Sequence, residues 1–181
     1  MKKNLTIPFV VVFISLLFFS CIKDTDFDQA DDIAVTPVIE LNLIHFNVTG
    51  GDFFDTITST PILTLRDTTE IRFLDDQEIQ ESLKRAEFYF KFTNSIPRDF
   101  LVNFQFLSEA NDTTYETQAN VITGSTQAPV ITEFVENVEG DAILQLTQAS
   151  KVVVSVTIPS SSAELEGALN LQSKTTYYLE F

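Results

Sequence analysis

Cysteine is nearly absent from this 181-residue sequence, in which Cys21 is the only one. A disulfide within the chain is therefore excluded, although small secreted domains often depend on several. The sequence also contains a single histidine, His45. It cannot form a transition-metal site built from several His and Cys ligands, and a Ser-His-Asp triad would have to use His45. We expect no cofactor, no metal site and no catalytic residue, with His45 as a structural or surface residue of a strand.

Positive charge is scarce as well, with 11 Lys and Arg against 26 Asp and Glu and a formal charge of −15. Without residues 1–20 the balance is 9 against 26, a charge of −17. Such a surface repels phosphate backbones, so nucleic-acid binding through a basic patch is excluded. The five glycines form neither a phosphate-binding loop nor a dinucleotide fingerprint.

The first 21 residues have the three-part layout of a bacterial export signal. Lys2 and Lys3 form a positive start, residues 5–19 are almost entirely apolar, and the small residue Ser20 precedes Cys21. The apolar run is shorter than the ~20 residues that span a bilayer. No basic cluster follows it. We expect residues 1–20 to be removed as a signal peptide, with a retained membrane anchor as the alternative.

This signal resembles that of bacterial lipoproteins, in which the cysteine after the cut is acylated and becomes the new N-terminus. Residues 22–36 (IKDTDFDQADDIAVT) are rich in aspartate and have little to bury, so residues 21–36 are expected to be a lipidated Cys and an acidic, solvated tether. The stretch KDTDFDQADD resembles the opening of small outer-membrane lipoproteins of Bacteroidota, a group without an assigned activity. The resemblance implies a lipid anchor at Cys21 in the outer membrane, with cell-surface exposure as one option.

Four aspartates of this tether also fit ligand positions of a calcium-binding loop. Gln29 and Val35, however, stand where that loop requires Gly for its sharp turn and Glu as its bidentate ligand. We therefore prefer a charged tether to a calcium site.

From residue 37 to 181, apolar and polar residues alternate with a period of two, the pattern of half-buried strands. Two brief helices interrupt it, one starting at Asp75-Asp76 and one at residues 142–150. The pattern predicts one all-β domain: an antiparallel, Ig-like β-sandwich of about 7–9 strands with two short helices. Within residues 39–48 the alternation slips by one residue, which predicts a β-bulge near Leu43–Ile44.

The strictest alternation is FYFKFTNSIPRDFLVNFQF, residues 88–106, which predicts a hairpin with one buried face. An aromatic binding platform is the alternative to this core assignment. The segment resembles the paired strands of Ig-like accessory domains in surface lipoproteins. The aromatic residues expected in the core are Phe88, Phe90, Phe92, Phe100, Phe104 and Phe106.

Three Asp-Thr motifs followed by an apolar residue or Thr resemble the O-glycosylation signal of exported Bacteroidota proteins. All three fall in expected loops or loop edges, where a glycan is tolerated. Ordinary Asp-Thr turn chemistry is the alternative explanation. The candidate acceptors are Thr56, Thr68 and Thr113.

Together these features favour a non-catalytic, envelope-anchored lipoprotein that acts as a binding or structural accessory module. Its expected partners are the membrane, through the lipid anchor, and an envelope protein or glycan. Such a module would present loops at one end of the sandwich, here Gly50–Thr60, Ser108–Thr113 and Pro159–Ala163. One alternative is a pilus-like surface subunit that assembles by strand exchange, with the polar strand at Tyr115 as its edge. A small hydrolase using two carboxylates is the other.

Overall fold

The computed structural model describes residues 34–181, of which Val35–Phe181 form one compact unit. The signal peptide, Cys21 and nearly all of the acidic tether lie outside the described residues, so the expectations placed on them stay predictions. Within residues 34–181, no helix has the length and apolar character needed to cross a bilayer.

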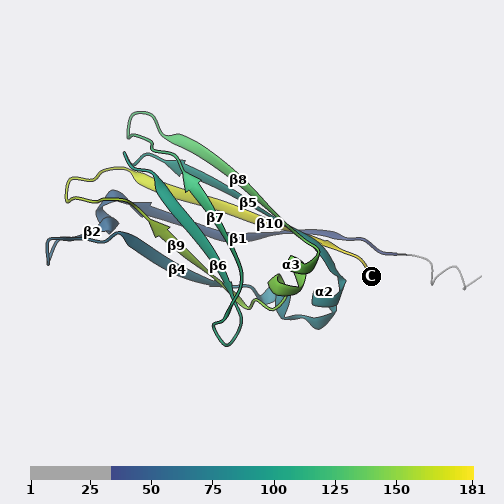
Figure 1. Ribbon diagram of the computed structural model, residues 1–181. Coiled ribbons are helices and arrows are strands. Elements are labelled where there is room, and N and C mark those ends of the chain that lie inside the picture. The colour runs from purple at the N-terminus through teal and green to yellow at the C-terminus, as the bar shows by residue number, and fades with distance from the viewer. Residues whose placement is uncertain (1–33) are drawn as a thin grey trace, which may run out of the picture. The chain divides into compact units, whose positions relative to one another are not determined.

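Two four-stranded sheets form the body of this unit (Figure 1). The first contains β1 (Val38–Thr49), β10 (Ala168–Leu179), β5 (Leu83–Asn94) and β8 (Val130–Glu139), in that order. The second contains β4 (Thr64–Glu70), β9 (Lys151–Thr157), β6 (Phe100–Leu107) and β7 (Thr113–Val121). Every paired strand is antiparallel, so the predicted antiparallel β-sandwich is confirmed. A separate small hairpin is formed by β2 (Phe54–Asp55) and β3 (Thr60–Pro61).

The connections between the strands are those of a jelly roll. When the short strands β2 and β3 are left out and the eight long strands are renumbered 1 to 8 along the chain, β1-β10-β5-β8 becomes the order 1-8-3-6. The second sheet, β4-β9-β6-β7, becomes 2-7-4-5. This is the arrangement of two Greek keys in an eight-stranded, double-sheet jelly roll. Immunoglobulin domains instead place strands ABED opposite CFG. The sandwich class is as expected, but its strand order is the jelly-roll order.

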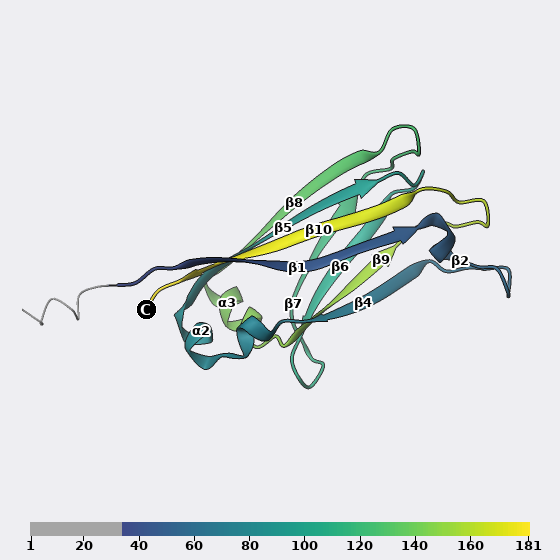
Figure 2. The same cartoon turned by 180° about the vertical axis from the view of Figure 1, so that it is seen from behind.

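The core is built mainly from the phenylalanines of β5 and β6, none of which is more than 2% exposed. Phe90 stacks on Phe104 with ring centroids 4.1 Å apart. Because β5 and β6 lie in different sheets, the predicted hairpin is wrong: residues 95–99 carry the chain from one sheet to the other (Figure 2). Alternation shows which face of a strand is buried, and two strands that face each other across a core show the same alternation as two that pair.

Both predicted helices are present, at the end of the sandwich where the chain terminates (Figures 1 and 2). Helix α2 (Gln77–Ser82) follows a short 3-10 turn, η3 (Arg72–Asp75), and is capped by Asp76. The Asp76 carboxylate accepts hydrogen bonds from the backbone N–H of Glu78 (2.9 Å) and Ile79 (3.2 Å). Helix α3 (Asp141–Leu146) is shorter than predicted and buries Ile143 and Leu146. These helices close one end of the core.

Loops alternate between the two ends, because each long strand crosses the whole sandwich. Gly50–Thr60, which includes the 3-10 turn η2 (Gly50–Phe53), and Pro159–Ala163 share the end opposite the helices. Ser108–Thr113 follows β6 and lies at the helical end, so the expectation that these three loops cluster is wrong. The helical end also holds Val35 and Phe181, joined by two backbone hydrogen bonds of 3.2 and 2.9 Å.

Asn94 ties together the loops at the end opposite the helices. This fully buried side chain donates to the carbonyls of Arg98 (2.8 Å) and Ile122 (2.9 Å) and accepts from the N–H of Ile96 (2.8 Å). Gly167, with φ of +104°, packs so closely that a Cβ would lie 2.4 Å from the Ser95 carbonyl oxygen. The loop end is therefore held by interior contacts.

Candidate functional site

The predicted β-bulge in β1 is confirmed and organises the outer face of the first sheet. Asn42 pairs with Lys174 and His45 pairs with Gln172, so two residues of β1, Leu43 and Ile44, stand opposite the single residue Ser173. The buried Ser173 hydroxyl accepts a hydrogen bond from Ile44 N–H (2.9 Å) and donates one to the Ile44 carbonyl (2.7 Å). The bulge therefore keeps its backbone satisfied without the regular ladder.

The bulge decides which side chains of β1 face outward. In a regular strand Asn42 and residue 44 would share the outer face, since every second residue points the same way. The extra residue moves His45 to the outer face, beside Asn42, and turns Ile44 into the core. Bulges elsewhere re-aim side chains in this manner next to functional sites.

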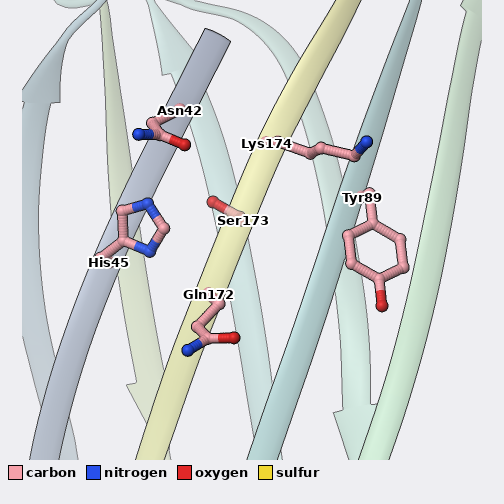
Figure 3. Close-up of a pocket in the computed structure, with 6 residues that line it drawn as sticks. All are labelled: Asn42, His45, Tyr89, Gln172, Ser173 and Lys174. Atoms are coloured by element: carbon pink, nitrogen blue, oxygen red, sulfur yellow. The ribbon is translucent and has the colours of Figure 1, made fainter. Parts of the chain in front are cut away.

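A shallow hollow of about 250 Å³ lies over this bulge, and three neighbouring strands contribute to it. Figure 3 shows Asn42 and His45 on β1, Gln172, Ser173 and Lys174 on β10, and Tyr89 on β5. Their strand positions define two rows across the sheet. One row is Asn42, Lys174 and Tyr89. The other is His45 and Gln172, and it continues on β5 with Lys91, which is not part of the lining of the hollow.

The side chains of Asn42, His45 and Gln172 are exposed. Within residues 34–181 they have no hydrogen-bond partner. Two carboxamides and an imidazole, each able to donate and accept, therefore stand free in one hollow.

The other polar groups of the hollow are held by their neighbours. Tyr89 donates its hydroxyl to Glu133 Oε1 at 2.7 Å, and this hydrogen bond raises the pKa of Tyr89. Lys174 Nζ lies 2.8 Å from Glu40 Oε2, a contact that raises the pKa of Lys174. Both carboxylates stand outside the hollow, and its lining within residues 34–181 contains neither Asp nor Glu. The free amides and imidazole are thus framed by groups in fixed positions.

A second, apolar feature follows the seam between the two sheets on the side of β1 and β4. One groove of about 250 Å³ is lined by side chains that include Phe46, Val48 and Leu65. A smaller one of about 100 Å³ lies farther along the seam, next to Leu41 and Phe73. Both strands are edge strands of their sheets, so this seam has unpaired backbone on each side.

The opposite seam, between β7 and β8, is closed by a polar cluster. Glu136 points inward from β8 and accepts hydrogen bonds from the hydroxyls of Tyr115 (2.5 Å) and Thr117 (3.1 Å), both on β7. Burial raises the pKa of Tyr115, and the bond to Glu136 raises it further. The polar strand at Tyr115 is an edge strand as predicted, but this cluster ties it to the facing sheet.

The three candidate glycosylation threonines are exposed. Thr56 follows Asp55, whose carboxylate accepts hydrogen bonds from the Thr58 hydroxyl (2.7 Å) and the Ile57 N–H (2.8 Å). The Thr58 hydroxyl is the largest cause of the lowered pKa of Asp55. At this motif the aspartate has a turn-forming role, as in the alternative explanation. Thr68 lies within the edge strand β4 and Thr113 begins β7, so neither is in the middle of a loop.

No group of three or more His, Cys, Asp or Glu within residues 34–181 could hold a metal ion. Two carboxylates, Glu164 and Glu166, do line one hollow of about 230 Å³ among the loops opposite the helices, and both are exposed. A general acid of a glycosidase needs an environment that raises its pKa, usually burial. Their exposure makes this pair a poor match for that chemistry.

Comparison with known proteins gives only distant structural similarities. No protein-family model and no curated protein matches the sequence. One similar structure is that of a protein from Parabacteroides distasonis, a member of Bacteroidota, which is inferred to be secreted. Its TM-score is 0.47 and its identity 14%, and the match covers 63% of this chain and 37% of that one. The VP2 subviral particle of infectious bursal disease virus gives a TM-score of 0.48 and 6% identity, covering 80% of this chain and 32% of that one. The enzymatically active domain of tailspike protein 4 of bacteriophage CBA120 gives a TM-score of 0.38 and 14% identity, covering 81% of this chain and 19% of that one. This chain thus spans between 19% and 37% of the length of each, and no function is transferred.

Proposed function

We propose that this chain is a non-catalytic binding module, anchored to the cell envelope by a lipid on Cys21. The module holds a polar partner in the hollow over the bulge of β1. The observation that carries the proposal is the cluster of free hydrogen-bonding side chains from Asn42, His45 and Gln172 in a frame of paired neighbours. Preorganised polar groups of this kind give orientation and specificity to binding sites.

The anchor is supported by the sequence of residues 1–21 and by the single cysteine. A lipoprotein with two or more acyl chains stays on the membrane, whereas one chain binds only marginally. Within the compact unit, Val35 is the residue nearest to Cys21 in sequence, and it lies at the helical end. The outer face of the first sheet runs along the length of the sandwich away from that end, and no other element of residues 34–181 covers it (Figure 2).

The proposal is tested with the purified full chain and envelopes from cells that lack it. Saturable binding is expected, and Gln172→Ala should weaken it because this change removes an exposed amide of the hollow without touching the core. Gln118→Ala is the matched control, an exposed glutamine on β7 of the other sheet. Absence of binding, or equal weakening by both substitutions, contradicts the proposal.

A pilus-like subunit is the second candidate, and the open seam between β1 and β4 favours it. A mainly apolar groove, which Arg66 and Asp67 also line, is flanked by two edge strands and offers room for a strand donated by another copy. This candidate predicts a ladder of multimers on a gel, which Leu65→Arg should abolish by replacing an apolar side chain of the groove with a bulky, charged one. A chain that stays monomeric at every concentration excludes it.

A further inference from the structure

We propose that the ligand of the hollow is an uncharged oligosaccharide, laid across strands β1, β10 and β5. This inference rests on the proposed function, because it names the chemical class of the partner for the same site. Four features of the hollow lead to it: the type of its free side chains, the ring of Tyr89, the spacing of its rows and its charge.

The free side chains match the hydrogen-bonding pattern of sugar hydroxyls. A hydroxyl donates one hydrogen bond and accepts up to two, and a carboxamide offers both functions side by side. Asn42 and Gln172 supply two such amides, and the imidazole of His45 adds a third group of mixed character. Groups that only donate, such as the Lys174 ammonium, are engaged by neighbours instead.

Tyr89 supplies a flat apolar surface at the edge of the hollow. Its ring is half-buried, and its hydroxyl is held by Glu133 at 2.7 Å, so the orientation of the ring is set before any ligand arrives. The C–H face of a pyranose is apolar and packs on an aromatic ring, while its hydroxyls point sideways to polar neighbours. A site with one aromatic ring and two amides therefore suits a sugar.

The spacing of the side chains fits a chain of sugars that crosses the strands. His45, Gln172 and Lys91 occupy one row on three adjacent strands, and neighbouring strands lie ~4.8 Å apart. This step is comparable to the length of one pyranose ring, so successive sugars would meet successive strands. The hollow is open to solvent, which lets a chain extend beyond it.

A peptide is a weaker match for this face. Extended peptides bind sheets mainly by adding a strand, which requires unpaired backbone. Two of the three strands that line the hollow, β10 and β5, are paired on both sides. A ligand over them must be bound through side chains, as an oligosaccharide is.

Charge separates neutral from acidic sugars. The whole chain carries −15, and the carboxylates of Glu40 and Glu133 flank the hollow on either side. Lys174, the cation that lines the hollow within residues 34–181, is paired with Glu40 at 2.8 Å. An anionic sugar would therefore meet no unpaired cation in the lining of this hollow, and the field of the protein would repel it.

The test measures binding of the full chain, purified in detergent, to a panel of neutral oligosaccharides and to acidic oligosaccharides of the same length. We expect neutral binding that Gln172→Ala weakens about tenfold, the loss of roughly one to two hydrogen bonds. Gln118→Ala should leave it unchanged. Tyr89→Ala should weaken it similarly, whereas Tyr89→Phe keeps the ring, loses only the hydrogen bond to Glu133 that orients it, and should weaken binding less than Tyr89→Ala does.

Each remaining outcome overturns the inference. Binding of acidic oligosaccharides alone, or neutral binding that is indifferent to Gln172→Ala, assigns the wrong ligand or the wrong site. If no neutral oligosaccharide binds while envelopes still do so in a Gln172-dependent way, the inference fails and the proposed function stands. If envelope binding is also absent, both fail.

Discussion

Ser173→Ala tests how the bulge of β1 builds the site. Ser173 is 3% exposed, and its hydroxyl forms two hydrogen bonds with the backbone of Ile44, at 2.9 and 2.7 Å. Alanine leaves a buried N–H and a buried C=O without partners, and each such group costs about 1–3 kcal/mol. We expect the free energy of unfolding to fall by about 2–4 kcal/mol, which a domain with a stability of about 5–15 kcal/mol survives. Ligand binding should weaken as well, because Asn42 and His45 lose their fixed positions.

The stability change is measured by urea unfolding followed by circular dichroism, since the chain has no tryptophan to report by fluorescence. Hydrogen exchange at the amide of Ile44 should become faster than at its neighbours. Ser162→Ala is the control: its half-buried side chain has no hydrogen-bond partner within residues 34–181, and the change should stay within about 0.5 kcal/mol. Equal stability changes for the two variants would refute the reasoning.

Three further predictions concern the core, the response to pH and the anchor. Phe90→Ala should lower the free energy of unfolding, measured in urea, by about 3–5 kcal/mol, because Phe90 is fully buried. The control Leu101→Ala, at a side chain that is 41% exposed, should change it by no more than about 1 kcal/mol. Similar values for both variants would contradict the core assignment. Burial raises the pKa of Tyr177 to about 12 from an ordinary value of 10.0. The contribution of Tyr177 to stability should therefore be constant below pH 10 and be lost from there toward pH 12, and this alkaline loss should be smaller in Tyr177→Phe. Identical alkaline profiles for the two chains would show that this residue is not responsible. Cys21→Ala should release the protein from the outer-membrane fraction and change its mobility on a gel; a protein that remains there unchanged is not held by a lipid on Cys21.

The sequence predicts well which face of each strand is buried, but poorly which strands pair with each other. The bulge at Leu43–Ile44 is predictable because a phase slip within one strand is a local signal. The burial of the six phenylalanines of β5 and β6 follows from strict alternation in the same way. The pairing of those strands does not, since alternation is identical for a hairpin and for two strands facing each other across the core. The strand order of the jelly roll is therefore seen only in the structure.

The candidate site depends on pairings that link distant parts of the sequence. Asn42 and His45 meet Gln172 only because β1 and β10 are neighbours, although about 130 residues separate them along the chain. The sequence contains one signal that points to this place, the phase slip in β1, which moves His45 to the outer face. Gln172 and Tyr89 carry no local signal, because a polar residue on the outer face of a strand is ordinary. The sequence therefore predicts a structural or surface role for His45 and does not reveal which residues lie beside it.

The bulge of β1 has two possible roles, protection of a sheet edge and placement of a binding site. Since β1 is an edge strand, the bulge also protects that edge from pairing with other chains. Edge protection accounts for the distortion of the backbone, but it places no requirement on the side chains around it. On this same face Tyr89 is bonded to Glu133, Lys174 to Glu40, and Arg85 lies 3.8 Å above the ring of Tyr178. Water can satisfy the hydrogen bonds of any single exposed amide, so exposure alone does not indicate a binding site. The grouping of free amides and an imidazole over the bulge, beside the bonded side chains of Tyr89 and Lys174, is the feature that edge protection leaves unexplained and the proposed ligand binding explains.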